Sequence, residues 1–364
     1  MKFITSKETF ESALFAARRA VKLNSPLGIL QGIHMTARGD RLEVVGTDTE
    51  LTIRYTAEVE VTDEGEVIVN AGIYDLVKRL PAGPVEVERA ENELLLRYSG
   101  SEARVSVYAG EFPAVPSVDG RGIEVDAAEF LNAVGRVYFA CYGNHDKPIL
   151  TGVLFKATPF GLELVASDMN RMNWAYLPAD GESEVDAVVP QATLQEALKV
   201  LDGDRVTIHV RDNFVVFRGG SVEVFSRTIA GKYPDYRAVI PENFCARVRV
   251  KVKDLLETLG RAAVIVDNRN ISKVKVDICD KKMTVSASGI GSGITETLEV
   301  NHEGDPISMF FRTNYLAEAV KVVGKEEVDI YFTADRPAGK VVDGDDTYFS
   351  LILPLIKEAA EAAA

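Results

Sequence analysis

The pattern of apolar and polar positions along the chain occurs three times. Residues 73–87, 194–208 and 316–330 each show apolar residues at the i, i+4 spacing of a helix, followed by an alternating strand. The aligned strands begin at Val85, Val206 and Val328, about 120 residues apart, which is the length of a domain and not of a solenoid unit. The pattern therefore predicts three similar domains.

Each repeat has a second predicted helix nearer its start. These helices begin near Ser6, Asp126 and Lys251, and Ser6 and Asp126 are suited to cap the first turn. Alternating strands follow every helix, so each repeat is predicted to contain two β-α-β-β-β units of class α+β, with helices packed on one side of antiparallel sheets. The predicted domains are residues 1–120, 121–243 and 244–364.

Composition supports this interpretation without adding chemistry. The 364 residues are 46% hydrophobic and 26% charged, an ordinary globular profile with no apolar run long enough to span a membrane. The charged N-terminal segment is unlike a signal peptide, so we expect a cytoplasmic protein. Three cysteines without a Cys-x-x-Cys motif indicate buried thiols in a reducing compartment: Cys141, Cys245 and Cys279.

Few residues suggest catalysis. The four histidines lack metal-ligand spacing from one another or from cysteine, so no metal or other cofactor is expected. The glycine-rich segment 289–294 continues into a strand, which favours a hairpin turn over a phosphate-binding loop. Asp48 and Asp168 recur at matching turns, as expected for Asx-type turns.

The charge distribution matters more than the net charge of −14. Binding to a polyanion depends on the local field at the contact surface. Basic residues recur on the predicted helices in every repeat, whereas acidic residues gather in strands and loops. A carboxylate also recurs on each of the first-described helices, at Asp75, Glu196 and Glu318. Three like domains with their helices facing inward would present a positive inner surface and a negative outer one.

At this level of detail the chain resembles the bacterial DNA polymerase III beta subunit, the sliding clamp. The resemblance covers residues 1–357, and its most specific motif is YPDYRAVIP at 233–241. The other motifs are MKF at 1–3, PLGIL at 26–30, GTDTEL at 46–51, LTGVLF at 150–155 and VASDMNRM at 165–172.

The resemblance implies a head-to-tail homodimer of six clamp domains, with helices inside and sheets outside, closing as a ring around double-stranded DNA. It implies a non-catalytic processivity factor that is opened by a clamp loader. The DNA polymerase III catalytic subunit, other polymerases and repair proteins would bind it through short peptides, and no membrane partner is expected.

The resemblance also implies three sets of site residues. The residues expected to face DNA are Arg18, Arg19, Lys22, Lys78, Arg79, Arg136, Asn144, Lys147, Lys199, Arg261 and Lys321. The expected peptide pocket consists of Leu150, Ser167, Met169, Asn170, Arg171, Met172, Pro234, Val239, Leu351, Leu353 and Pro354. The expected dimer interface pairs Val105 and Val107 of the first domain with Val264 and Ile265 of the third.

Two departures from the family pattern affect the pocket. The family commonly has Gly-His where this chain has Met169-Asn170, and the segment KEAAEAAA at 357–364 extends beyond the usual end. Two other functions remain open. One is an accessory clamp for repair or a mobile element, which gene deletion would separate from an essential one. The other is a hydrolase using Asp48 and Asp168, for which turnover would be detectable.

Overall fold

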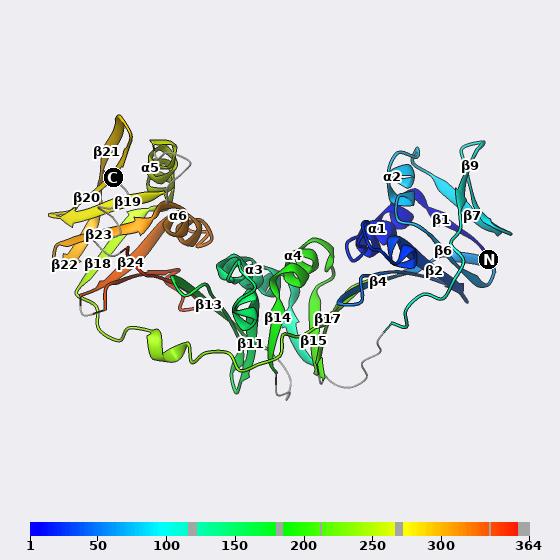
Figure 1. Cartoon of the computed structure of the whole chain (residues 1–364), viewed down its shortest axis with the longest axis horizontal. Helices are drawn as coiled ribbons and strands as arrows, with labels where there is room; N and C mark the ends of the chain where they lie inside the picture. The colour runs from blue at the N-terminus through cyan, green and yellow to red at the C-terminus, as the bar shows by residue number, and fades with distance from the viewer. Residues whose placement is uncertain (116–121, 180–184, 212, 266–271, 335, 356–364) are drawn as a thin grey trace. The chain divides into compact units, whose positions relative to one another are not determined.

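A computed structural model describes residues 1–115, 122–179, 185–211, 213–265, 272–334 and 336–355 (Figure 1). The chain divides into two compact units, Met1–Leu131 with Ala179–Ala230 and Asn132–Pro178 with Gly231–Ala364. These units do not follow the three domain ranges expected from the repeats, and those ranges stay predictions.

The first repeat contains the expected two β-α-β-β-β units. Ser6 caps the first helix, because its Oγ accepts a hydrogen bond of 3.0 Å from the backbone N–H of Thr9. The first unit comprises β1 (Lys2–Ser6), α1 (Lys7–Arg18), the short 3-10 helix η1 (Gly28–Gln31), β2 (Gly32–Arg38), β3 (Arg41–Thr47) and β4 (Leu51–Glu58). After the short strand β5 (Glu60–Asp63), the second unit comprises β6 (Gly65–Asn70), α2 (Ile73–Val77), β7 (Pro84–Ala90), β8 (Glu93–Tyr98) and β9 (Ser101–Ser106).

The middle repeat follows the same order. Asp126 accepts a hydrogen bond of 3.0 Å from the N–H of Glu129 in the first turn of its first helix, as its capping role predicts. The first unit comprises β10 (Ile123–Asp126), α3 (Ala127–Val137), the 3-10 helices η2 (Tyr138–Ala140) and η3 (Pro148–Thr151), β11 (Gly152–Thr158), β12 (Gly161–Ser167) and β13 (Arg171–Leu177). The second comprises β14 (Asp186–Pro190), α4 (Gln191–Val200), β15 (Arg205–Arg211), β16 (Phe214–Gly219) and β17 (Val222–Arg227).

The third repeat follows a connector that carries η4 (Arg237–Val239). Its first unit comprises β18 (Ala246–Lys251), α5 (Val252–Ile265), β19 (Lys273–Cys279), β20 (Lys282–Gly289) and β21 (Ser292–Glu299). Its second, after the short strand β22 (Asn301–Gly304), comprises β23 (Ile307–Arg312), α6 (Thr313–Lys321), β24 (Glu327–Thr333), β25 (Ala338–Val342) and β26 (Tyr348–Ile352). The segment around Gly291 forms the hairpin between β20 and β21, as predicted.

Strands from different repeats pair within each of the two compact parts of the chain. In the part formed by Met1–Leu131 and Ala179–Ala230, the sheet orders are β5-β1-β7-β8-β9 and β10-β15-β16-β17-β4-β3-β2-β6, and β4 pairs antiparallel with β17. In the other part, β11-β12-β13-β26-β25-β24-β18-β22 follow one another, and β13 pairs antiparallel with β26. A separate sheet has the order β21-β20-β19-β23. The fourth strand element of one repeat therefore joins the last strand of the following repeat at both junctions.

Helices pack side by side against these sheets and close the cores. In the first repeat α1 lies beside α2, and in the third α5 lies beside α6 (Figure 1). The first core includes Phe3, Phe10 and Leu14, all fully buried. Helix α1 lies so close to β3 that a Cβ at Gly46 would be 1.9 Å from the carbonyl oxygen of Ala17. Only glycine permits this approach.

The prediction for the cysteines is correct for one residue. Cys141 is buried, and burial raises the pKa of its thiol to about 12. The expectation of buried thiols was wrong for Cys279, which is exposed at the end of β19, and Cys245 is only half-buried. Cys279 lies beside the turn from β19 to β20, and sequence spacing does not reveal that its side chain is exposed there.

Candidate partner-binding site

The hollow that gathers the predicted pocket residues lies beside the β13–β26 pairing. It has a volume of about 400 Å³, and Met172 and Leu351, directly opposite each other in the register, form part of its lining. Nine of the eleven residues expected in the pocket line it: Leu150, Ser167, Met169, Arg171, Met172, Pro234, Val239, Leu351 and Leu353. Leu351 is 4% exposed, whereas Val239 is 55% and Leu353 45% exposed, so the hollow combines a packed floor with accessible apolar walls.

Asn170 and Pro354 lie next to the hollow without lining it. The backbone carbonyl of Asn170 accepts a hydrogen bond of 2.9 Å from the N–H of Leu353, which fixes the end of β26 against the turn before β13. Asn170 thus helps to shape the hollow through its backbone.

A tight turn places Met169 at the rim. Asp168 Oδ1 accepts hydrogen bonds of 2.9 Å from the N–H groups of Asn170 and Arg171, which is the predicted Asx-type geometry. The backbone of Met169 has φ = +71°, a left-handed conformation that favours glycine. Its side chain is 44% exposed, and the ammonium group of Lys147 lies 2.8 Å from its sulfur.

The equivalent turn of the first repeat has the same geometry. Asp48 Oδ1 accepts hydrogen bonds from the N–H groups of Glu50 and Leu51 at 3.0 and 2.8 Å. Thr49 takes the place of Met169, with φ = +78°. Both aspartates therefore shape turns, as the sequence predicted.

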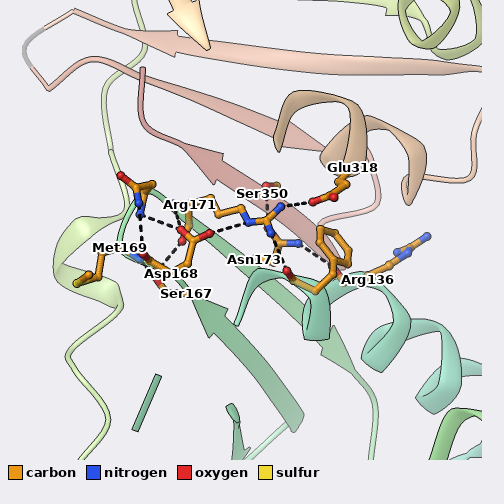
Figure 2. A network of polar contacts seen from close by, with 10 residues as sticks. Arg136, Ser167, Asp168, Met169, Arg171, Asn173, Glu318 and Ser350 are labelled. Carbon is orange, nitrogen blue, oxygen red and sulfur yellow. Dashed lines mark hydrogen bonds and ion pairs between the residues drawn. The ribbon is translucent and has the colours of Figure 1, made fainter. Parts of the chain in front are cut away.

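Arg171 connects the hollow with the junction between the middle and third repeats. It is only 8% exposed, and it donates hydrogen bonds to Asp168 Oδ2 at 3.1 Å and to the carbonyl oxygen of Phe139 at 2.6 Å (Figure 2). It also forms an ion pair with Glu318 of α6, and its guanidinium lies 4.1 Å from the ring centroid of Tyr315. With its donors occupied, Arg171 is a structural side chain at the edge of the hollow.

Asn173 adds a buried polar connection two residues further along β13. Its side chain donates a hydrogen bond of 2.8 Å to the carbonyl of Arg136 and accepts one of 2.7 Å from Ser350 Oγ on β26 (Figure 2). Both Asn173 and Ser350 are almost fully buried. These bonds fix the register of the junction, because a shift would leave buried polar groups unpaired.

The connector between the second and third repeats forms one wall of the hollow. Glu163 of β12 accepts hydrogen bonds from the hydroxyl of Tyr236 and from the guanidinium of Arg237, the latter at 2.9 Å to both oxygens. These contacts hold the YPDYRAVIP segment across the sheet. Sequence reasoning missed Glu163, whose position opposite the connector becomes evident only in three dimensions.

The residues expected to face DNA fall into two groups. Five are engaged with carboxylates: Arg18 with Asp75, Arg19 and Lys199 with Glu196, Arg136 with Asp343, and Arg261 with Glu296. Lys22, Lys78, Arg79, Lys147 and Lys321 are exposed, and among the described residues none has a carboxylate within ion-pair distance. Asn144 is also exposed, and its side chain lies 3.5 Å from the hydroxyl of Tyr142.

The residues expected at the dimer interface are partly exposed in each unit. Val105 is half-buried on β9, and Val107 forms an isolated bridge with Val69. Val264 is 83% exposed and Ile265 half-buried, at the end of α5. The extension 357–364 lies outside the described residues.

The described residues suggest neither a metal centre nor a membrane span. Within them, no cluster of three or more His, Cys, Asp or Glu side chains has the arrangement needed to hold a metal ion. None of the helices in these residues combines the length and the apolar character required to cross a bilayer.

Comparison with known proteins identifies the family. Three family models match the chain in tandem: the N-terminal domain of the DNA polymerase III beta subunit at residues 1–116, the central domain at 124–235 and the C-terminal domain at 237–355. The chain belongs to the DNA polymerase III beta subunit family, and the predicted three tandem clamp domains are confirmed.

Individual relatives agree with this assignment along the whole chain. The beta sliding clamp of Bacillus subtilis is 26% identical, over 98% of this chain and 99% of the relative, and that of Staphylococcus epidermidis is 26% identical with the same coverage. Among solved structures, the sliding clamp of B. subtilis has a TM-score of 0.92 at 24% identity, covering 98% of this chain and 99% of its own. The beta subunit from DNA polymerase of Streptococcus pyogenes has a TM-score of 0.92 at 21% identity, covering 98% and 100%. The fold is therefore that of a sliding clamp.

Proposed function

We propose that this chain is a DNA sliding clamp, a ring-forming processivity factor that encircles duplex DNA and tethers polymerases. It acts without catalytic activity of its own and works in the cytoplasm. The observation that carries the proposal is the equivalence of its strand junctions. β4 pairs with β17, and β13 pairs with β26, so each repeat joins the next through equivalent edge strands.

The same pairing of edge strands between neighbouring repeats leaves two strands, β9 and β21, without a partner strand from another repeat. β21 is the equivalent of β4 and β13, β9 is the equivalent of β17 and β26, and each is the end strand of its sheet. A second copy supplies the missing partners, with β21 of one chain pairing with β9 of the other. Two such contacts are made in a head-to-tail homodimer, which closes a ring of six domains.

The helix ends support the same assembly. When the first helices of the three repeats are aligned, Val264 is equivalent to Arg19 and Phe139. Arg19 meets Glu196 of the following repeat, and the carbonyl of Phe139 accepts a hydrogen bond from Arg171 near α6. This equivalence supports Val264 as a residue of the third junction, where a second chain would be its neighbour.

Retention on DNA depends on closure of the ring around the duplex more than on the strength of protein–DNA contacts. Lys22, Lys78, Arg79, Lys147 and Lys321 supply cations for phosphates without reading bases. A topological link tolerates the net charge of −14, because retention does not require tight contact. A clamp loader opens the ring.

The hollow beside Met172 receives the short peptides through which the polymerase III catalytic subunit, other polymerases and repair proteins bind. Its exposed apolar walls suit one or two Leu or Phe anchors, and exposed apolar patches of this kind usually serve a partner. Dissociation constants near micromolar are expected, because few side chains are buried on binding.

Retention on circular DNA tests the proposal. The protein, loaded by its cognate loader onto nicked circular DNA, should stay bound through gel filtration and should be lost after the DNA is linearised. Equal loss from both substrates would overturn the ring mechanism. Met172→Glu tests the peptide site separately, since a buried unpaired carboxylate should abolish binding of a fluorescent polymerase peptide while DNA retention persists.

A further inference from the structure

A second hollow lies next to the partner-binding hollow on the side of the connector. Its volume is about 520 Å³, and it is formed by the connector and by the turn after β24. Ile240, Pro241 and Arg336 line both hollows, so the two are adjacent and share this rim. A ligand held in the first hollow has only this shared rim to cross in order to reach the second.

Phe244 provides the second hollow with a positioned aromatic surface. Its side chain is 37% exposed, and its ring centroid lies 5.2 Å from that of Tyr331 with the planes tilted by 55°. The ammonium group of Lys340 lies 5.7 Å from the same ring. A ring held by neighbours loses little conformational entropy on binding, which is a property of interface hot spots.

The charged residues that line the second hollow are close to balanced, and Lys340 adds a cation beside Phe244. The guanidinium of Arg237 is neutralised by Glu163, and the exposed Arg336 and Glu242 have opposite signs. The aromatic face of Phe244 therefore supplies the apolar contact of a lining that also contains polar residues such as Asn243 and Thr333.

We propose that partner peptides anchored in the first hollow continue across Pro241 and Arg336 into the second, where a large apolar or aromatic flanking residue packs on Phe244. This inference rests on the proposed peptide-binding function of the first hollow. It predicts that partners are distinguished by a residue flanking the anchors.

Cys245 allows a direct test, because it lines the second hollow and is half-buried. Two peptides with Leu and Phe anchors are prepared, one with a chloroacetamide at its N-terminus and one with it at its C-terminus. A thiolate attacks the chloroacetamide carbon, forms a C–S bond and releases chloride. One of the two peptides should alkylate Cys245 at least tenfold faster than a scrambled peptide with the same electrophile, as measured by peptide mass spectrometry.

The other two thiols provide controls in the same molecule. Cys279 is exposed, but a hydrogen bond to Asp280 raises its pKa, and Cys141 is buried with a raised pKa. Free chloroacetamide gives the intrinsic order of reactivity for the three. If neither tagged peptide labels Cys245 above the scrambled control, the proposed path is wrong.

Phe244→Ala tests the aromatic contact. It should weaken a peptide that carries an aromatic flanking residue about tenfold and leave a peptide containing only the anchors unchanged. Phe160→Ala is the matched control, since Phe160 is 82% exposed in the turn between β11 and β12 and lines neither hollow.

Met172→Glu distinguishes a failure of the proposed partner site from a failure of its extension into the second hollow. If Met172→Glu leaves peptide binding intact, the proposed partner site itself fails. If Met172→Glu abolishes binding but Phe244→Ala has no effect on the longer peptide, the first hollow stands and the extension is overturned.

Discussion

Arg136 of α3 donates a hydrogen bond of 3.1 Å to Asp343, which lies 207 residues later in the chain and has a side chain only 1% exposed. Arg136 also donates to the carbonyl of Val323 at 3.2 Å, and Asp343 accepts a bond of 2.6 Å from Thr347. The pair therefore links the end of a middle-repeat helix to the loop before β26. Its role in this structure is to hold the junction.

Arg136→Ala should lower the free energy of unfolding by about 3 kcal/mol, because it leaves a buried carboxylate without its cation. Thermal denaturation followed by the fluorescence of Trp174, the one tryptophan of the chain, provides the measurement. Trp174 stacks on Phe349 at 5.2 Å within the same junction, so it reports on this region. Lys321→Ala is the control and should change stability by less than about 0.5 kcal/mol. Equal effects of the two changes on the free energy of unfolding would show that the contact between Arg136 and Asp343 adds no stability.

Met169→Gly and Thr49→Gly should each raise stability by up to about 1 kcal/mol, because both residues occupy left-handed backbone conformations. Denaturant unfolding measures this shared effect. Only Met169→Gly should change the order in which a panel of peptides binds, because Met169 lines the partner-binding hollow and Thr49 does not. An altered peptide order in Thr49→Gly would indicate an indirect cause.

Val264→Asp should convert the dimer to a monomer while leaving the fold intact, since Val264 is 83% exposed within one chain. Burying an unpaired carboxylate in the proposed contact costs more than the contact gains. Ile265→Asp should have the same effect on assembly. Sedimentation velocity at micromolar concentration gives the mass, and Phe160→Asp should remain a dimer. A Val264→Asp variant that stays dimeric would place the interface elsewhere.

Changing Lys78, Arg79 and Lys321 together to Glu should shorten retention on circular DNA without altering the dimer. These cations lack carboxylate partners among the described residues, so the change removes charge that is available for phosphates. The residence time of a fluorescent clamp on single circular DNA molecules measures the effect. Changing Arg97, which pairs with Glu86, Glu88 and Glu102, to Gln is the comparison and should affect retention much less. Equal shortening in both variants would argue against contact through the helices.

Asp329 should give the third repeat a pH-dependent stability. Burial alone would raise the pKa of this carboxyl, but hydrogen bonds from Arg249 and Arg247 outweigh burial and hold the pKa below its usual value. A lowered folded-state pKa stabilises the fold above the unfolded-state value near 4, and this contribution is lost as pH falls through the folded-state pKa. Asp329→Asn should therefore be less stable than the original protein at pH 7, with the difference shrinking below about pH 4. A difference that is constant with pH would exclude this linkage.

The repeats and turns were predictable because their determinants are local. Apolar spacing within each helix, the caps at Ser6 and Asp126, and the turns at Asp48 and Asp168 depend on residues only a few positions apart. Most residues that line the hollow were named through the resemblance to the clamp family, because the YPDYRAVIP and VASDMNRM motifs lie on the segments that form it.

Long-range partners were not predictable from one sequence. No local pattern connects Arg136 with Asp343, or Glu163 with Arg237, because each pair depends on how distant strands and connectors pack. The second hollow was missed for the same reason. Its aromatic surface depends on Phe244 meeting Tyr331, and the rim that it shares with the first hollow includes Arg336, which belongs to a turn without a distinctive motif.

The end strands β9 and β21 have a consequence for how the protein avoids misassembly in dilute solution. A strand with unpaired N–H and C=O groups is a template for incorrect pairing. A linear string of any length always keeps one β9 and one β21 without a partner, whereas a closed pair keeps neither in that state. Once two chains have joined at one contact, the second forms at the high effective concentration of tethered ends, so closure outcompetes growth in dilute solution. Ring formation therefore also protects the chain from aggregation, and a lone chain is the species most exposed to misassembly.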